Sequence, residues 1–158
     1  MNRTVESLLR FVNLATSGLL AGSLGFGRTA LVPGWEAERP RRSESAAGHD
    51  EAASYYNAIG PIALVSAMTL AVGSKRQSRA RRTFDVLSTV GLTGVLALTV
   101  LVTVPINKRL ELRAPADYPN VESTSLTRHW ARAQALRTAL GVGAFLCAVA
   151  SSLGADRK

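Results

Sequence analysis

The sequence predicts an all-α protein, a four-helix transmembrane bundle with an extracytoplasmic loop cap. Hydrophobic residues make up 47% of the chain and are concentrated in four stretches without any charged residue. These stretches have 17, 23, 22 and 18 residues, close to the length that a helix needs to cross the hydrocarbon core: Phe11–Gly27, Ala52–Ser74, Val86–Asn107 and Thr138–Ala155. The helices of a soluble bundle would carry charges on their outer faces, so a membrane protein is expected.

The four expected spans, with their flanking residues, cover approximately residues 8–32, 52–74, 85–107 and 130–154 of a single membrane domain, residues 1–158. The first is interpreted as a retained span, because it is rich in glycine and no clear small-x-small cleavage site follows it. Proline lacks an N–H donor and its ring disturbs the helical ladder, so helix breaks are expected near Pro33, Pro61 and Pro105. The four-residue spacing of Gly18 and Gly22 favours close approach of helices.

The basic residues predict the orientation of the bundle. The net charge is +8, and we interpret the arginines between the spans as topology signals that contact anionic lipid, with no nucleic-acid partner. Ser74–Thr83 holds five cations and no acid, so the termini and this loop are expected in the cytoplasm of a cell with the bundle in its plasma membrane. The third loop, Lys108–His129, is long enough to form the cap. The single cysteine, Cys147, is expected to be a buried apolar residue.

Polar and aromatic residues gather at the extracytoplasmic ends of the predicted spans. Because successive spans cross the membrane in opposite directions, the ends of the first and third spans meet the starts of the second and fourth. The residues expected at this shared end are Arg28, Tyr55, Asn57, Asn107, Trp130, Gln134 and Arg137. Trp130, Gln134 and Arg137 share one helical face, because they stand at i, i+4 and i+7. We expect Arg137 to point into the bundle, held by Asn107 or a carbonyl group. These positions predict the mouth of a ligand pocket.

The two histidines leave a metal site open as an alternative. His49 and His129 both lie near this rim, and with Asp50, Glu51 or Glu122 they could bind a metal ion. No helical metal-ligand spacing supports such a site, and the sequence has no cysteine pair and no glycine-rich phosphate loop. We therefore expect no metal and no other cofactor, and keep a metal-dependent membrane oxidase using His49 and His129 as an alternative.

Two motifs carry a resemblance to a known family. The segment Val104–Leu110 resembles the Pro-x-Asn-x-x-Leu segment after the third span in the anthrone oxygenase-like family of small four-helix membrane proteins. Residues 130–138 resemble that family's Trp-x-x-x-His/Asn-x-x-Arg-Thr segment, which opens the fourth span. Gln134 departs from the pattern, because it stands where the family often has histidine.

The resemblance implies a membrane-embedded oxygenase, a monooxygenase of polyketide-type phenols, that oxidises a planar, anthrone-like substrate with dioxygen and no cofactor. It implies that Arg137 and Asn107 stabilise an enolate oxygen and that Trp130 stacks on the substrate ring. Because Gln134 replaces the family's histidine, His129 is the first candidate for the base and Tyr55 the second. The other residues expected to bind the substrate are Gln134, Asn57 and Arg28.

The expected partners are thus a small aromatic substrate, dioxygen and the lipid bilayer, and a homo-oligomer is left open. A non-catalytic membrane binding or assembly protein is the second alternative. In that case the same polar groups would only pack the helices against each other.

Overall fold

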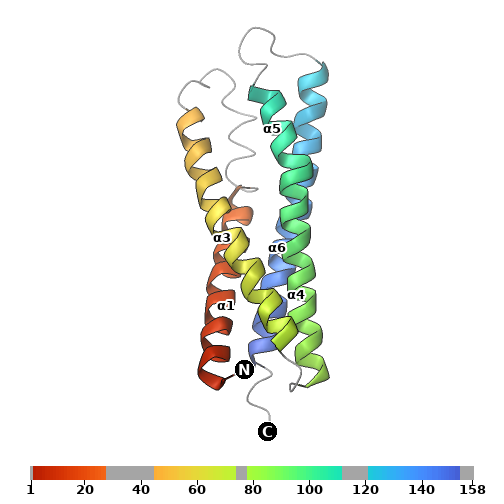
Figure 1. Ribbon diagram of the computed structural model, residues 1–158. Helices are drawn as coiled ribbons and strands as arrows, with labels where there is room; N and C mark the ends of the chain where they lie inside the picture. The colour runs from red at the N-terminus through yellow and green to blue at the C-terminus, as the bar shows by residue number, and fades with distance from the viewer. Residues whose placement is uncertain (1, 28–44, 74–77, 112–120, 154–158) are drawn as a thin grey trace.

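The computed structural model describes residues 2–27, 45–73, 78–111 and 121–153. Their helices are α1 (Arg3–Phe26), α3 (Ser45–Gly73), α4 (Arg79–Leu98), the π-helix η2 (Thr99–Thr103), α5 (Val104–Glu111) and α6 (Val121–Leu153). Because α4, η2 and α5 follow each other without a gap, the described residues form four long rods and no strand (Figure 1). The predicted all-α four-helix bundle is confirmed. Pro33 and the centre of the expected loop cap, residues 112–120, lie outside the described residues.

The lengths and apolarity of the rods identify a membrane protein. Among the described residues, three helical segments are long and apolar enough to cross a membrane: Arg3–Phe26, Arg79–Ile106 and Arg128–Leu153. A shorter apolar helix, Ala58–Gly73, lies within α3. Many of the outward side chains are large and apolar, for example Val65, Val90 and Leu146, which is the surface that a helix presents to lipid.

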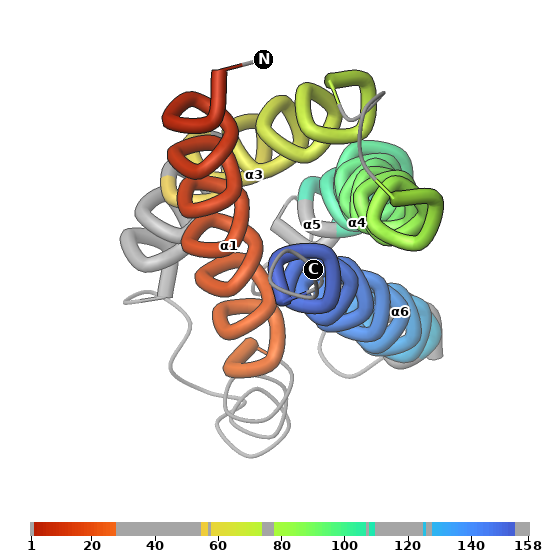
Figure 2. The backbone as a smooth tube through the Cα atoms, turned by 90° about the horizontal axis from the view of Figure 1, so that it is seen from below, coloured from red at the N-terminus to blue at the C-terminus, as the bar shows by residue number. Residues whose placement is uncertain are grey.

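The rods pack in a closed ring, in which α1 contacts α3 and α6, and α4 contacts the same two helices (Figure 2). The start of α1 lies at the same end of the bundle as the end of α6 (Figure 1). Each rod turns a stripe of buried residues inward at the spacing of three and four that a helix requires. The apolar centre of these stripes consists of Leu20, Leu24, Ala63, Ala67, Leu92, Val95 and Ala144.

Glycines allow α6 to approach its neighbours closely. A Cβ atom at Gly91 of α4 would lie 3.0 Å from Ala144 Cβ and 3.1 Å from the Leu140 carbonyl oxygen. A Cβ atom at Gly141 would lie 2.9 Å from Leu24 Cδ1. Gly18 packs against Phe145 in the same way, whereas a Cβ at Gly22 would meet nothing within 4 Å. The sequence therefore predicted close packing correctly at Gly18 but not at Gly22.

The two prolines within the described helices do not break them, so the expected breaks near Pro61 and Pro105 are wrong. Pro61 lies inside α3, since a helix supported by neighbouring rods tolerates the loss of one ladder bond. Before Pro105 the chain widens into η2, where the Val104 N–H donates to the Thr99 carbonyl oxygen, five residues back. This wider turn accommodates the proline next to it, and the helix then continues to Glu111.

Candidate functional site

Arg137 lies inside the bundle, as expected. Its side chain projects from α6 and the residue is only 5% exposed. Nη1 donates to Gln134 Oε1 at 3.0 Å and to Thr103 Oγ1 at 3.5 Å, and Cζ lies 5.8 Å from the ring centroid of Tyr56. The side chain of Asn107, one of the expected partners, lies outside the described residues. The guanidinium group is thus held by an amide, a hydroxyl and an aromatic ring.

Gln134 connects this guanidinium group to α1. Its Nε2 donates to the Leu24 carbonyl oxygen at 3.3 Å, and the Thr138 hydroxyl donates to the same oxygen at 3.2 Å. Leu24 lies in the last turn of α1, where carbonyl groups have few partners within their own helix. A Cβ at Gly27 would lie 3.2 Å from Gln134 Nε2, so the end of α1 leaves little free space beside the amide.

Together these residues form the Arg137 cluster, defined as Leu24, Tyr56, Thr103, Gln134 and Arg137. All four rods contribute to it, since Leu24 comes from α1, Tyr56 from α3, and Thr103 from η2. Within the described part of the chain, Arg137 Nε is buried and has no hydrogen-bond partner. A buried cation with an unused N–H donor is suited to stabilise negative charge that develops on a substrate oxygen.

The structure brings together three of the predicted site residues, Trp130, Gln134 and Arg137. All three are buried on the inward face of α6. Neither predicted base lies with them. His129 is exposed, with its Nδ1 2.8 Å from the Ser125 carbonyl oxygen, and Tyr55 is 37% exposed, with its hydroxyl 3.5 Å from the Leu19 carbonyl oxygen.

The remaining predicted residues fall where the side chains are not described. Asn57 and Asn107 occupy helical positions of α3 and α5, and His49 is also in α3, while Arg28 follows the end of α1. Among the described residues, no group of three or more histidine, cysteine, aspartate or glutamate side chains is placed to hold a metal ion.

Sequence reasoning missed Tyr56 and Thr103 as members of the cluster. Helical spacing could have identified Tyr56, because this residue lies four residues before Gly60 and seven before Ala63, and both of these are buried. Tyr55 is turned away from that stripe by the rotation of one residue. Thr103 depends on the π-helical turn of η2, which shifts the inward face of the rod and has no periodic pattern in the sequence.

A second polar cluster, also missed, lies at the opposite end of the bundle. Asp85 is 2% exposed, and its Oδ1 accepts from Ser151 Oγ at 2.5 Å and from Arg10 Nη1 at 3.4 Å. Arg10 Nη1 also donates to Ser151 Oγ at 2.9 Å, and its Nε donates to Glu6 Oε1 at 3.1 Å. This Asp85 cluster (Glu6, Arg10, Asp85 and Ser151) joins α1, α4 and α6, and the apolar centre separates it from the Arg137 cluster.

The family assignment follows from a comparison with known proteins. Residues 52–147 match the model of the anthrone oxygenase family. The chain belongs to the anthrone oxygenase family. The match runs from within α3 into α6 and includes Tyr56, Thr103, Gln134 and Arg137, while α1 with Leu24 precedes it. Neither the curated proteins nor the solved structures contain a significant match to the chain.

Proposed function

We propose that this member of the anthrone oxygenase family is a membrane-embedded oxygenase that oxidises a planar phenolic, anthrone-like substrate with dioxygen and without a cofactor. The observation that carries the proposal is the buried guanidinium group of Arg137 inside the family-matched region. Gln134 and Thr103 hold its Nη1, and its Nε has no bond to a described residue. A fixed cation in an apolar bundle favours the anionic form of a substrate far more than a cation in water does.

The proposed reaction needs only a base and an electrostatic site. The base removes a proton from the ring methylene of the substrate, and the negative charge is delocalised onto the ring carbonyl oxygen, which becomes the enolate oxygen. One electron passes from this carbanion to dioxygen, and the two radicals combine to form a carbon-bound peroxide, which takes up the proton. Loss of water from this hydroperoxide leaves a quinone, so one oxygen atom enters the product and the other leaves as water.

The Arg137 cluster supplies the parts for this scheme. Arg137 stabilises the enolate oxygen, and Gln134 positions Arg137 through the 3.0 Å hydrogen bond. Trp130, buried on the same face of α6, is proposed to stack on the substrate ring. Arg28, Asn57 and Asn107 remain predicted to line the substrate site.

The base is proposed to be Tyr56, ahead of His129 and Tyr55. Arg137 Cζ lies 5.8 Å from the centroid of the Tyr56 ring, so this tyrosine is a member of the Arg137 cluster and its hydroxyl belongs to a residue that contacts the cation. The described positions of His129 and Tyr55 give them no contact with Arg137, so both serve as alternatives in the mutational test.

The test is turnover of an anthrone-like compound by purified protein under air after exhaustive chelation. We expect quinone formation and dioxygen uptake in equal amounts, from protein without flavin or haem absorbance. Activity that returns only with added iron or copper would transfer the proposal to the metal-dependent oxidase with His49 and His129. Folded protein that binds such compounds and never converts them would favour the non-catalytic binding protein.

The proposed location is the plasma membrane, with the termini and residues 74–83 in the cytoplasm. The five cations of that segment support this orientation. Single-cysteine variants in a Cys147→Ser background provide the measurement, with an impermeant thiol reagent applied to intact cells. Residues 113–120 should react and residues 75–82 should not, and equal labelling of both segments would contradict the topology.

A further inference from the structure

The three arginines at the start of α4 differ in their surroundings: one contacts the bundle and two are exposed. Arg81 turns toward the interior, where its Nε donates to the Ser151 carbonyl oxygen at 3.0 Å and its Nη1 lies 3.7 Å from Glu6 Oε1. Arg79 and Arg82 lie on the exposed side of the helix, and no described residue forms a hydrogen bond or salt bridge with either guanidinium group. The guanidinium groups of Arg79 and Arg82 therefore do not stabilise the described part of the bundle through a hydrogen bond or salt bridge.

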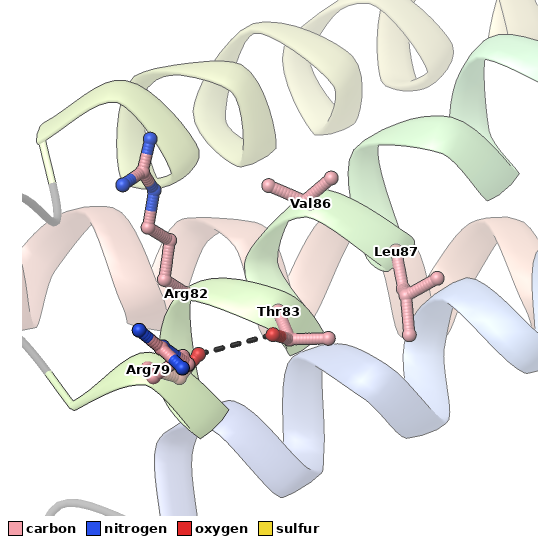
Figure 3. Close-up of a pocket in the computed structure, with 5 residues that line it drawn as sticks. All are labelled: Arg79, Arg82, Thr83, Val86 and Leu87. Carbon is pink, nitrogen blue, oxygen red and sulfur yellow. Dashed lines mark hydrogen bonds between the residues drawn. The ribbon is translucent and has the colours of Figure 1, made fainter.

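A hollow of about 230 Å³ lies beside these two cations (Figure 3). Arg79, Arg82, Thr83, Val86 and Leu87 line it, and their spacing places them on one face of α4. The Thr83 hydroxyl donates to the Arg79 carbonyl oxygen at 3.0 Å, as the dashed line in Figure 3 shows. The hydroxyl is thus occupied, and the two arginines line the hollow mainly with the apolar stems of their side chains, so their guanidinium groups are the nearest charged donors beside it.

The hollow lies at the start of a candidate membrane span. The helical segment Arg79–Ile106 is long and apolar enough to cross a membrane, and Arg79 is its first residue. Further along the same face Val86, Leu87 and Val90 are 43%, 48% and 61% exposed, as expected of side chains that contact acyl chains. This face of α4 therefore changes from the cationic residues Arg79 and Arg82 to exposed apolar residues, in the direction in which a phospholipid changes from headgroup to hydrocarbon.

We propose that this hollow binds an anionic phospholipid, with its phosphate between Arg79 and Arg82 and an acyl chain along Val86, Leu87 and Val90. Arginine binds phosphate oxygens through paired N–H groups, and cations at the membrane surface attract anionic lipids. The proposal does not depend on the Arg137 cluster, which lies at the opposite end of the bundle.

Lipid binding is measured by native mass spectrometry of the full chain in phosphatidylcholine nanodiscs titrated with phosphatidylglycerol. The double variant Arg79→Ala/Arg82→Ala is expected to bind phosphatidylglycerol on the order of tenfold more weakly than the wild type. The matched control is Arg128→Ala/Arg132→Ala, which removes two exposed cations from α6. It should bind as the wild type does. Equal weakening of both double variants would overturn the proposal, because it would indicate attraction by net charge alone.

A second variant keeps both cations and fills the hollow. Val86→Phe changes a lipid-facing side chain, so it should leave the unfolding midpoint in pure phosphatidylcholine unchanged while weakening phosphatidylglycerol binding several-fold. Binding of phosphatidylglycerol with wild-type affinity would overturn the placement of the acyl chain.

Competition with inorganic phosphate and with glycerol phosphate tests whether the hollow binds a lipid or a free anion. Neither should displace phosphatidylglycerol at equal concentration, because neither contacts the apolar part of the hollow. Displacement by either at equal concentration would overturn the lipid proposal in favour of a soluble phosphate ligand.

Discussion

The Nη1 atom of Arg137 lies 3.0 Å from Oε1 of Gln134, the residue one helical turn earlier on α6. Gln134 stands where the motif of the family often has histidine, and an amide cannot accept a proton as an imidazole can. It can accept from Arg137 with its oxygen and donate to Leu24 with its nitrogen, and both bonds are present. In this chain the position therefore orients the cation and secures α1 instead of titrating.

Gln134→Ala should destabilise the bundle. The change removes the closer of the two acceptors of Arg137 Nη1 and leaves Thr138 as the side-chain donor to the Leu24 carbonyl oxygen, and loss of a partner by a buried polar group costs about 1–3 kcal/mol. Thermal unfolding in detergent measures the effect. Leu136→Ala, a lipid-facing change on the same helix, is the control and should unfold close to the wild type. Equal midpoints for Gln134→Ala and the wild type would contradict the described hydrogen bonds.

Arg137→Ala should abolish most of the proposed activity. Loss of one donor to a developing oxyanion lowers turnover about 10²–10³-fold. Arg137→Lys should recover part of the rate, because it keeps the charge but loses the planar group that bonds Gln134 and Thr103. Turnover of the anthrone-like compound is measured against Arg132→Ala, an exposed arginine of α6. Equal tolerance of Ala at positions 132 and 137 would remove Arg137 from the site.

Three variants identify the base. Tyr56→Phe keeps the ring beneath Arg137 and removes the hydroxyl, so it should lower the rate by about 10²–10⁴-fold, the usual contribution of a general base. Tyr55→Phe and His129→Ala should retain most of the rate. Their side chains face Leu19 and Ser125 outside the cluster. A large loss in His129→Ala with a full rate in Tyr56→Phe would restore the histidine as the base.

The sequence was sufficient to predict that Arg137 points into the bundle, because Trp130, Gln134 and Arg137 share a helical face. It was insufficient for the partner Thr103, because the π-helical η2 shifts the phase of its rod. It also placed the spans by the absence of charge, and by this criterion the third uncharged stretch begins at Val86. Asp85, one residue earlier, is buried and paired with Arg10, which a search for uncharged stretches cannot recognise.

Asp85→Ala should be among the most destabilising substitutions at the opposite end of the bundle. It leaves the Arg10 guanidinium group, whose side chain is 11% exposed, without its buried carboxylate, and breaking such a pair costs about 3–5 kcal/mol. Glu6→Gln should cost less, because Glu6 is more exposed and Gln can still accept from Arg10.

A paired replacement distinguishes a broken ion pair from a general packing defect. Arg10→Met/Asp85→Leu removes both charges and fills similar space, so it should recover much of the stability lost in Asp85→Ala. Chemical or thermal unfolding of the wild type, Arg10→Met, Asp85→Leu and the double variant gives the coupling free energy between the two residues. Additive losses in the double variant would show that Arg10 and Asp85 do not stabilise each other, although their side chains are 3.4 Å apart.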